Sequence, residues 1–386
     1  MSTGLNAAVA AILLATAVAA HARVKYPETR KDPVVEDYHG VPVADPYRWL
    51  EDDNAPEVKA WVEAQNAVTA AYLDRLPARD ALRRRLTELW NYERFGVPAR
   101  RGGRYFYSRN DGLQNQSVLF VAEALDAEPR VLIDPNTLAA DGTVSLTGTA
   151  ITEDARLIAF GVARSGSDWQ EWRVRNVDTG EDLPDVIRWV KFSGVSWLKD
   201  GSGFFYSRFA EPPPGEELKG VLRNQRLYFH RLGTDQSADR LVYERPDQPE
   251  WTFNGRVTED GDYLVIYVSH GTDPKNRVYY QDLTRPGSPV VKLLDDFDAS
   301  YNFVDNDGPV FWFHTDLDAP RGRVIAVDIR RPERAQWRGG RPPAATTPQG
   351  GGARRDYTKL GQMVMRQLGN MGFQITKSDK AKAKAD

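Results

Sequence analysis

A five-fold repeat between residues 100 and 330 constrains the fold of this chain more than any other feature. Each unit contains a turn, a run of aromatic and β-branched residues, a short gap and a second such run. The first runs are 104–109, 156–161, 203–208, 262–267 and 309–314, and the second runs are 118–121, 172–176, 226–230, 277–280 and 323–327. Two β-prone runs in every unit of roughly 50 residues are typical of a four-stranded propeller blade. We therefore predict a mainly β fold with five blades.

The number of blades leaves two possibilities. A propeller packs every blade between two neighbours, so a ring that lacks blades exposes two apolar flanks. The repeat therefore predicts either a complete five-bladed ring or the first part of a larger one.

Composition excludes several classes of function. A formal net charge of −3 gives no electrostatic reason to expect a nucleic-acid or anionic-membrane partner. Cysteine is absent from the sequence, which excludes disulfides, thiolate zinc sites and a cysteine nucleophile. Beyond the N-terminus no stretch reaches the roughly 18 apolar residues that a membrane span needs.

The N-terminal segment 1–22 resembles a secretory signal. It carries no charged side chain, is apolar from Ala7 to Ala20 and ends in Ala20-His21-Ala22, an A-x-A-like cleavage pattern. The missing basic residue at its start leaves a misplaced start codon or an interior helix as alternatives. A signal predicts a periplasmic or secreted protein; without one, a cytoplasmic location is expected.

Segment 23–97 is predicted to be extended and then helical. Turns are expected at His39-Gly40 and Asp45-Pro46, followed by a helix that opens near Pro56 and a second from Asp80 to about Tyr92. Apolar residues recur at helical spacing in both helices. Each helix therefore needs an apolar surface on which to lie.

The C-terminal part changes character after the partial β-propeller predicted for 98–337. Segment 338–356 is rich in glycine and proline and is predicted to be a flexible linker. Segment 357–386 is a basic amphipathic tail: ten Lys or Arg against three Asp follow Trp337. Its origin is open between a frameshifted or fused reading frame and a genuine appendage.

Residues for familiar chemistries are missing or are explained by turns. No Gly-x-Ser-x-Gly pentapeptide occurs, and the nearest imitations, 164–169 and 200–203, are typical of hairpin turns. The five histidines are not spaced as metal ligands; His230 and His314 end predicted strands, where half-exposed rings are expected. We predict no catalytic residue, no metal site and no cofactor.

The repeated carboxylates and the glycine run are explained without a catalytic or phosphate-binding site. A five-bladed propeller could be a glycosidase with acid and base in its channel, but the repeated acids lie in turns, where Asp bonds to the local backbone. These acids are Asp154, Asp200, Asp260 and Asp307. The triple glycine Gly350 to Gly352 follows no predicted strand, so no phosphate-binding loop is indicated.

Several strings in the chain resemble the N-terminal half of prolyl oligopeptidase, over about 25–337 and in order. They are Tyr38-His-Gly-Val-Pro-Val-Ala-Asp-Pro-Tyr-Arg-Trp-Leu-Glu-Asp52, Val62-Glu-Ala-Gln-Asn66, Tyr105-Phe-Tyr, Gly112-Leu-Gln-Asn-Gln116, Ser165-Gly-Ser-Asp-Trp169, Leu183-Pro-Asp185, Val190-Lys-Phe-Ser193, Leu232-Gly-Thr-Asp-Gln236 and Asp273-Pro-Lys-Asn-Arg277. The resemblance implies a seven-bladed propeller that caps an α/β-hydrolase domain, on which the helices of 54–92 pack. It also implies cleavage of short peptides after proline by a Ser, Asp, His triad, with the propeller channel excluding folded proteins.

The sequence departs from that family in what it lacks. The last two blades and the hydrolase half find no counterpart here, so the resemblance implies an incomplete propeller of five blades and no triad in this chain. Phe192 matches an aromatic residue of the family's substrate cleft; a buried blade phenylalanine is the alternative. Ser269 and Thr272 stand where relatives often carry Arg and Cys, which puts that part of the cleft in doubt.

Two functions remain after this comparison. The first is the substrate-gating propeller part of a prolyl-oligopeptidase-type serine endopeptidase, inactive and poorly soluble alone. Its partners would be short proline-containing peptides and a separate hydrolase half. The second is a stand-alone propeller that binds a peptide or protein partner.

Overall fold

The computed structural model describes residues 24–217 and 220–339. The chain divides into two compact units, Met1–Tyr92 and Glu93–Asp386, which are described separately below. The predicted signal (1–22), most of the predicted linker and the whole predicted tail lie outside the described residues. No helix in the described ranges is long and apolar enough to cross a membrane.

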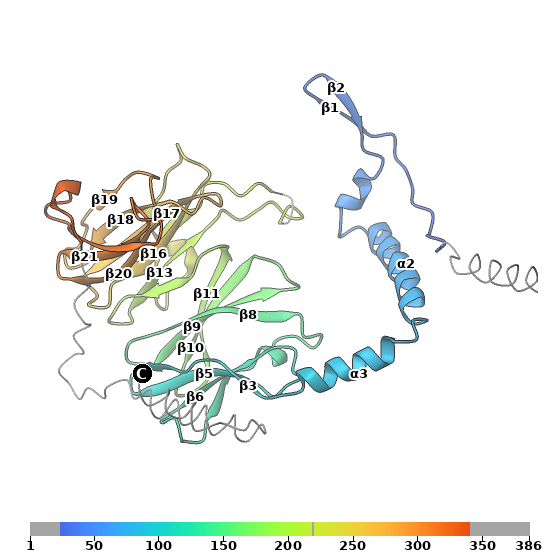
Figure 1. Ribbon diagram of the computed structural model, residues 1–386, viewed down its shortest axis with the longest axis horizontal. Helices are drawn as coiled ribbons and strands as arrows, with labels where there is room; N and C mark the ends of the chain where they lie inside the picture. Colours follow the sequence, from blue (N-terminus) through green and yellow to red (C-terminus); the bar gives the residue numbers. More distant parts are fainter. Residues whose placement is uncertain (1–23, 218–219, 340–386) are drawn as a thin grey trace, which may run out of the picture. The chain divides into compact units, whose positions relative to one another are not determined.

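The N-terminal unit contains two helices, as predicted, and the segment predicted to be extended before them includes a short hairpin (Figure 1). Strands β1 (Val35–Tyr38) and β2 (Val41–Ala44) are joined by His39 and Gly40, both with positive φ, 56° and 87°. Helix α2 (Pro56–Leu73) opens with proline in its first turn, where the missing N–H costs nothing. Helix α3 spans Arg79–Trp90. Of these elements' side chains only Val58 is buried, so residues 24–92 have almost no core of their own.

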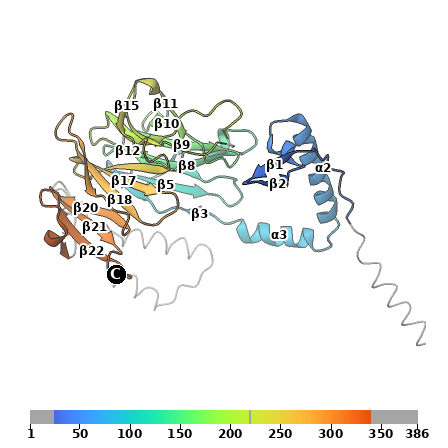
Figure 2. The same ribbon diagram turned by 90° about the horizontal axis from the view of Figure 1, so that it is seen from above.

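The described residues of the second unit form five antiparallel sheets, which we number as blades 1 to 5 (Figures 1 and 2). Blade 1 contains β3 (Arg94–Phe95), β5 (Arg104–Asn110), β6 (Val118–Ala122) and β7 (Arg130–Ile133), with β4 (Ala99–Arg101) also on β5. Blade 2 contains β8 (Val144–Ile151), β9 (Leu157–Arg164), β10 (Gln170–Asn176) and β11 (Asp182–Val190). Blade 3 contains β12 (Val195–Trp197), β13 (Gly203–Arg208), β14 (Arg226–Arg231) and β15 (Arg240–Tyr243). Blade 4 contains β16 (Trp251–Val257), β17 (Tyr263–His270), β18 (Asn276–Asp282) and β19 (Val290–Leu294), and blade 5 contains β20 (Tyr301–Asp307), β21 (Val310–Thr315), β22 (Arg323–Asp328) and β23 (Arg338–Gly339).

These sheets confirm the prediction of five blades, and each pair of predicted runs forms the two middle strands of a blade. The last sheet also extends into the segment assigned to the linker. Arg338 pairs with Ala326 and Gly339 with Ile325, so the edge strand of blade 5 ends two residues later than the predicted propeller.

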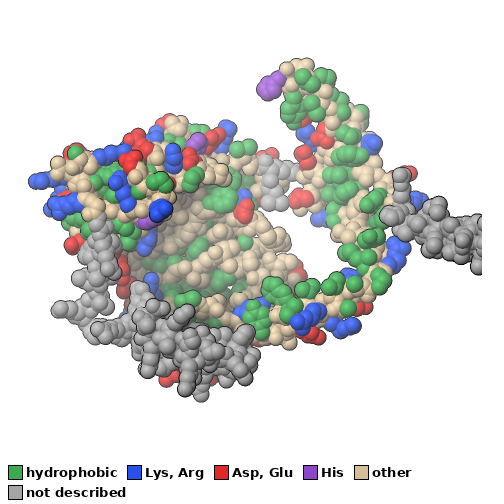
Figure 3. Space-filling model, in the orientation of Figure 1, with side chains coloured by type: hydrophobic (Ala, Val, Ile, Leu, Met, Phe, Trp, Pro, Cys, Tyr) green, Lys and Arg blue, Asp and Glu red, His purple; other side chains and the backbone are tan. Residues whose placement is uncertain are grey.

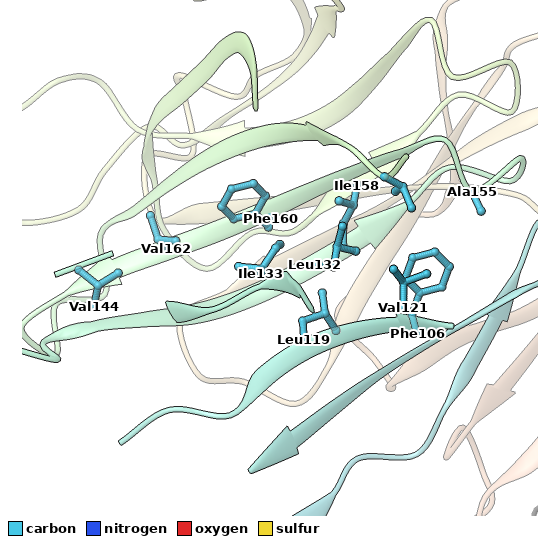
Figure 4. Close-up of a cluster of buried hydrophobic side chains, with 11 residues drawn as sticks. Phe106, Leu119, Val121, Leu132, Ile133, Val144, Ala155, Ile158, Phe160 and Val162 are labelled. Atoms are coloured by element: carbon cyan, nitrogen blue, oxygen red, sulfur yellow. The ribbon is translucent and has the colours of Figure 1, made fainter. Parts of the chain in front are cut away.

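The hydrophobic core lies between blades rather than within them. Four buried clusters join blade 1 to 2, 2 to 3, 3 to 4 and 4 to 5. The first, drawn in Figure 4, brings together Phe106 of β5, Val121 of β6 and Phe160 of β9. Each blade is therefore held to the next by apolar burial, the main favourable contribution to folding.

The middle strands read as unbroken apolar runs because both of their faces are covered. In β13, Phe204 and Tyr206 join the cluster shared with blade 2, while Phe205 joins the cluster shared with blade 4. All three are at most 1% exposed. Side chains that alternate between two buried faces must all be apolar, which explains the sequence repeat.

The first and last blades each have only one neighbour in the described chain. Phe106 of β5 faces blade 2, so Tyr105 and Tyr107 lie on the opposite side of the sheet. There the ring of Tyr107 stacks on that of Phe120 and is tilted against that of Phe95, with ring centroids 6.1 Å apart in both pairs, and the rings are only half-buried. The predicted apolar flank is thus present on blade 1.

Candidate functional site

The loops that carry the predicted site residue Phe192 and its neighbours lie at one end of the blades. Because neighbouring strands are antiparallel, the loops after the second and the fourth strand of each blade lie at the same end of the sheets. These include the turn after β11, which carries Phe192, and the loops after β13 and β17. We call this end the Phe192 face.

Phe192 is exposed on this face. Its side chain is 60% exposed and its backbone is left-handed, with φ 55°. The alternative interpretation, a buried blade phenylalanine, is therefore wrong. A bulky residue with positive φ is strained by about 1–2 kcal/mol, and such strain concentrates at functional sites. Whether Phe192 contacts a substrate stays a prediction.

Lys191 sets the electrostatic surroundings of Phe192. Its Nζ lies 5.0 Å from the ring centre of Trp169 and 5.6 Å from that of Phe192, and 3.7 Å from a carboxylate oxygen of Asp168. The lysine side chain is only 15% exposed. An ammonium group is attracted to the face of an aromatic ring, so Lys191 attracts both rings and helps to hold Phe192 near Trp169.

A second strained residue lies just before Lys191. Trp189 has φ 62°, and its carbonyl accepts a hydrogen bond of 3.1 Å from the N–H of Phe209. Trp169 meets both Trp189 and Phe209 edge to face, at centroid distances of 5.7 and 6.2 Å. Three aromatic residues from blades 2 and 3 thus support the turn that presents Phe192.

The buried side chain of Gln225 anchors the same turn from the other side. Its Nε2 donates to the carbonyl of Lys191 at 3.0 Å, and its Oε1 accepts from the N–H of Phe253 at 2.6 Å. Gln225 is 1% exposed. The turn at Lys191 and Phe192 is therefore tied to the first strand of blade 4 by an uncharged amide.

Ser269 and Thr272, at which the resemblance implies a difference from the family, also lie on the Phe192 face. Ser269 is the second-last residue of β17 and is half-buried, and Thr272 is exposed in the loop that follows. Neither side chain carries a charge, so this part of the face offers hydroxyl groups.

The serine segments that imitate a nucleophile are turns. Ser165 and Gly166 have positive φ in the β9–β10 hairpin, and the N–H of Ser167 donates to the carbonyl of Arg164 at 2.9 Å. In the β12–β13 turn, Asp200 accepts from the N–H of Ser202 at 2.9 Å. Both serine segments are accounted for by ordinary turn geometry.

Three of the repeated acids bond to their own turns. Asp154 accepts from the N–H of Arg156 at 3.0 Å, and Asp260 accepts from the N–H of Asp262 at 3.0 Å, as Asp200 does from Ser202. The N–H and hydroxyl of Ser202 lower the pKa of Asp200. Such a carboxylate is a poor general acid at neutral pH.

His230 differs from its sequence-based interpretation. The prediction of a half-exposed ring is wrong: the side chain is 0% exposed and lies 5.0 Å from the ring of Phe204. Nδ1 is 2.7 Å from Asp239 Oδ1, and Nε2 is 2.9 Å from Asp185 Oδ1. Burial alone would lower the pKa of His230, but the hydrogen bonds to Asp239 and Asp185 outweigh it and the pKa is raised. Sequence reasoning missed this cluster because Asp185 comes from the neighbouring blade.

Five blades joined by inter-blade cores, with strained aromatic residues gathered at one end, define a propeller domain. The family comparison gives the lineage. Residues 26–342 match the prolyl oligopeptidase N-terminal beta-propeller domain, and the chain belongs to this family.

Individual relatives agree. A prolyl endopeptidase from Elizabethkingia meningoseptica is 38% identical over 335 residues, which cover 86% of this chain and 47% of the relative. Prolyl oligopeptidase A from Amanita bisporigera is 33% identical, over 80% of this chain and 45% of the relative. The solved structure of prolyl oligopeptidase B from Galerina marginata bound to a 35mer hydrolysis and macrocyclization substrate matches with a TM-score of 0.71 at 30% identity, over 82% of this chain and 48% of that one. The chain thus spans about half the length of these relatives, at their N-terminal side.

Proposed function

We propose that this chain is the substrate-gating propeller part of a prolyl-oligopeptidase-type serine endopeptidase that cleaves short peptides after proline. The observation that carries the proposal is the exposed, strained ring of Phe192 beside the shielded ammonium of Lys191. An exposed aromatic face can stack on the ring of proline, and a nearby cation can attract a peptide carbonyl. The propeller supplies recognition, and the reacting groups come from a hydrolase half.

The N-terminal helices support the same function. Leu82, Leu86 and Leu89 of α3 are 60%, 55% and 51% exposed, and they lie on one side of the helix at spacings of four and three residues. Such a stripe on a short helix calls for an apolar partner surface. A hydrolase half would provide it.

Complementation tests the proposal. The chain is co-expressed with the C-terminal half of the Elizabethkingia prolyl endopeptidase, and hydrolysis of a chromogenic peptide with proline before the leaving group is measured. We expect activity from the pair, none from the chain alone and a raised KM in the pair carrying Phe192→Ala. Fluorophosphonate labelling of a serine in the chain alone, or a pair that associates but stays inactive, would count against the proposal.

Location is proposed separately. If the apolar segment 1–22 with its Ala20-His21-Ala22 ending is cleaved, the protein is periplasmic or secreted; otherwise it is cytoplasmic. N-terminal sequencing of the mature protein, expected to begin at Arg23, decides between them.

A further inference from the structure

The boundary between blades 2 and 3 contains a buried charged cluster with no part in the proposed function. Asp185 comes from β11 of blade 2, whereas His230 of β14 and Asp239, just before β15, belong to blade 3. The three side chains are at most 1% exposed. Each ring nitrogen of His230 faces its own aspartate, at 2.9 Å and 2.7 Å.

Proton counting restricts the charge of this cluster. A carboxylate only accepts hydrogen bonds, and a neutral imidazole has a single N–H, so two carboxylates can be satisfied only by a ring with both nitrogens protonated. Each carboxylate also accepts from a further donor. The N–H of Gly233 donates to Asp185 Oδ1 at 2.5 Å, and the hydroxyl of Tyr206 donates to Asp239 Oδ2 at 2.6 Å. These extra donors favour two ionised aspartates around one cation.

We propose that His230 is an imidazolium at neutral pH that clamps blade 2 to blade 3, and that loss of its proton at alkaline pH releases this clamp. The neutral ring would leave one buried aspartate without its donor. Loss of this donor would affect Asp185 most, because its Oδ2 is already buried without a hydrogen-bond partner among the described residues. An uncompensated buried charge is strongly destabilising.

The clamp holds the two walls of a surface pocket of about 700 Å³. One wall is β11, with Pro184, Val186 and Arg188, and the other is the segment Thr234 to Ser237. Asp185 fixes the start of that segment through Gly233. Further along, the side-chain amide of Gln236 accepts from the N–H of Arg188 and donates to its carbonyl, both at 3.1 Å. Release of the clamp therefore loosens this pocket and leaves the rest of the propeller in place.

Titratable groups face His230 from every element around it. They are Asp185 of β11, Tyr206 of β13, and Asp235 and Asp239 on either side of the short 3-10 helix Gln236–Ala238. Arg208, at the end of β13, acts on Tyr206. Burial, and then the bond to Asp239, raises the pKa of Tyr206, so its hydroxyl remains a donor over the range tested. His230 is the group whose charge changes there.

The neighbouring boundaries use uncharged amides and give an internal control. Gln225, directly before β14 of blade 3, accepts a hydrogen bond from the N–H of Phe253 in blade 4. Asn276 joins blade 4 to blade 5: its Oδ1 accepts from the N–H of Tyr301 at 2.7 Å, and its Nδ2 donates to the carbonyl of Tyr301 at 3.0 Å. Neither amide titrates, so a pH effect at neutral to alkaline pH should be confined to blades 2 and 3.

The direction of the pH effect follows from the raised pKa of His230. A histidine whose folded pKa exceeds the unfolded value stabilises the fold fully below the unfolded pKa of about 6.5, and this stabilisation is lost as pH rises through the folded pKa. Between the two values the unfolding equilibrium constant should increase about tenfold per pH unit.

The first test measures the ring directly in the full chain labelled with ¹⁵N-histidine. We expect both ring nitrogens of His230 to carry protons at pH 7.5 and one to lose its proton at higher pH. In the same step the amides of Gly233 and Arg188 should exchange faster with solvent than that of Tyr301, after correction for intrinsic rates. A single protonated ring nitrogen at pH 7.5, or equal changes at all three amides, would overturn the proposal.

The second test compares two variants by thermal and urea unfolding from pH 6 to 10. His230→Gln should abolish the tenfold-per-unit dependence. His270→Gln should retain it, although His270 also faces a carboxylate, Glu250 at 3.2 Å, because that pair is half exposed. Retention of the dependence in His230→Gln would refute the clamp. If that variant does not fold, the ring measurement on the unaltered chain gives the answer by itself.

Discussion

The N-terminal unit and the blades obtain their stability in different ways. Between residues 93 and 339 every blade boundary contains its own cluster of buried side chains, whereas between 24 and 92 only Val58 is buried. In Figure 3 hydrophobic side chains lie along the surface of the N-terminal unit. The blades are thus stabilised by hydrophobic cores at their boundaries, while the N-terminal helices leave apolar side chains exposed.

The largest expected effect lies in the core between blades 4 and 5. Phe311 is 0% exposed, and its ring lies 5.0 Å from that of Tyr263 and 5.4 Å from that of Phe303. Phe311→Ala should lower the free energy of unfolding by about 3–5 kcal/mol, because lost burial and a cavity add together. Urea unfolding measures the loss, with the exposed Leu86→Ala as the control. Equal losses at the two positions would remove the distinction between the units.

The second effect tests whether polar bridges add to the apolar clusters. Asn276→Ala leaves both the N–H and the carbonyl of Tyr301 without their side-chain partner. We expect a loss of about 2–4 kcal/mol, since each buried group left unpaired costs about 1–3 kcal/mol. Asn302→Ala, at an exposed position one residue further on, should cost well under 1 kcal/mol in the same unfolding measurement. Similar small losses for both would mean that water replaces the bridge.

The third effect separates recognition from stability on the Phe192 face. Phe192→Asn should raise the free energy of unfolding by roughly 0.5 kcal/mol, because asparagine tolerates the left-handed backbone better than phenylalanine does. In the complemented enzyme the same variant should bind proline peptides more weakly. Calorimetric melting and KM measure the two consequences. A destabilised variant would show that the ring of Phe192 is held by contacts stronger than its backbone strain.

How well a strand could be predicted from the sequence depends on how completely its two faces are buried. The middle strands were found because both faces are buried, as in β13 with Phe204 and Phe205 on opposite sides. The outer strands were not distinguished, because their patterns are mixed: β8 contains Gly148, and β11 contains Pro184 and mixes buried with exposed positions. The two helices could be predicted from the helical spacing of their apolar residues. This spacing indicates an apolar face, whether the surface that covers it lies in the same unit or elsewhere.

The site was predicted only in part. Phe192 was found through the resemblance to the family, but no local pattern gave its exposure or its positive φ, which depend on Gln225 and on Phe209, 33 and 17 residues further along. His230 was misjudged because a strand-ending histidine is usually exposed. Its burial depends on two aspartates, one of them 45 residues earlier in the neighbouring blade. A single sequence carries no signal for contacts at that separation.

The smallest effect on stability is expected for substitutions on α3. They test most directly the difference between the N-terminal unit and the blades. Leu82→Gln with Leu86→Gln removes apolar area that is already more than half exposed, and glutamine forms helices about as well as leucine, so the free energy of unfolding should change by less than about 0.5 kcal/mol. Binding of a hydrophobic dye and self-association of the chain should both fall, because the stripe gathers exposed leucine side chains on one side of the helix. Leu113→Gln, at an exposed leucine of blade 1, is the matched control and should leave dye binding nearly unchanged. The same pair of substitutions should weaken complementation by a hydrolase half, although no blade is altered. If dye binding persists while complementation is normal, the exposed stripe of α3 is not the surface that such a partner covers.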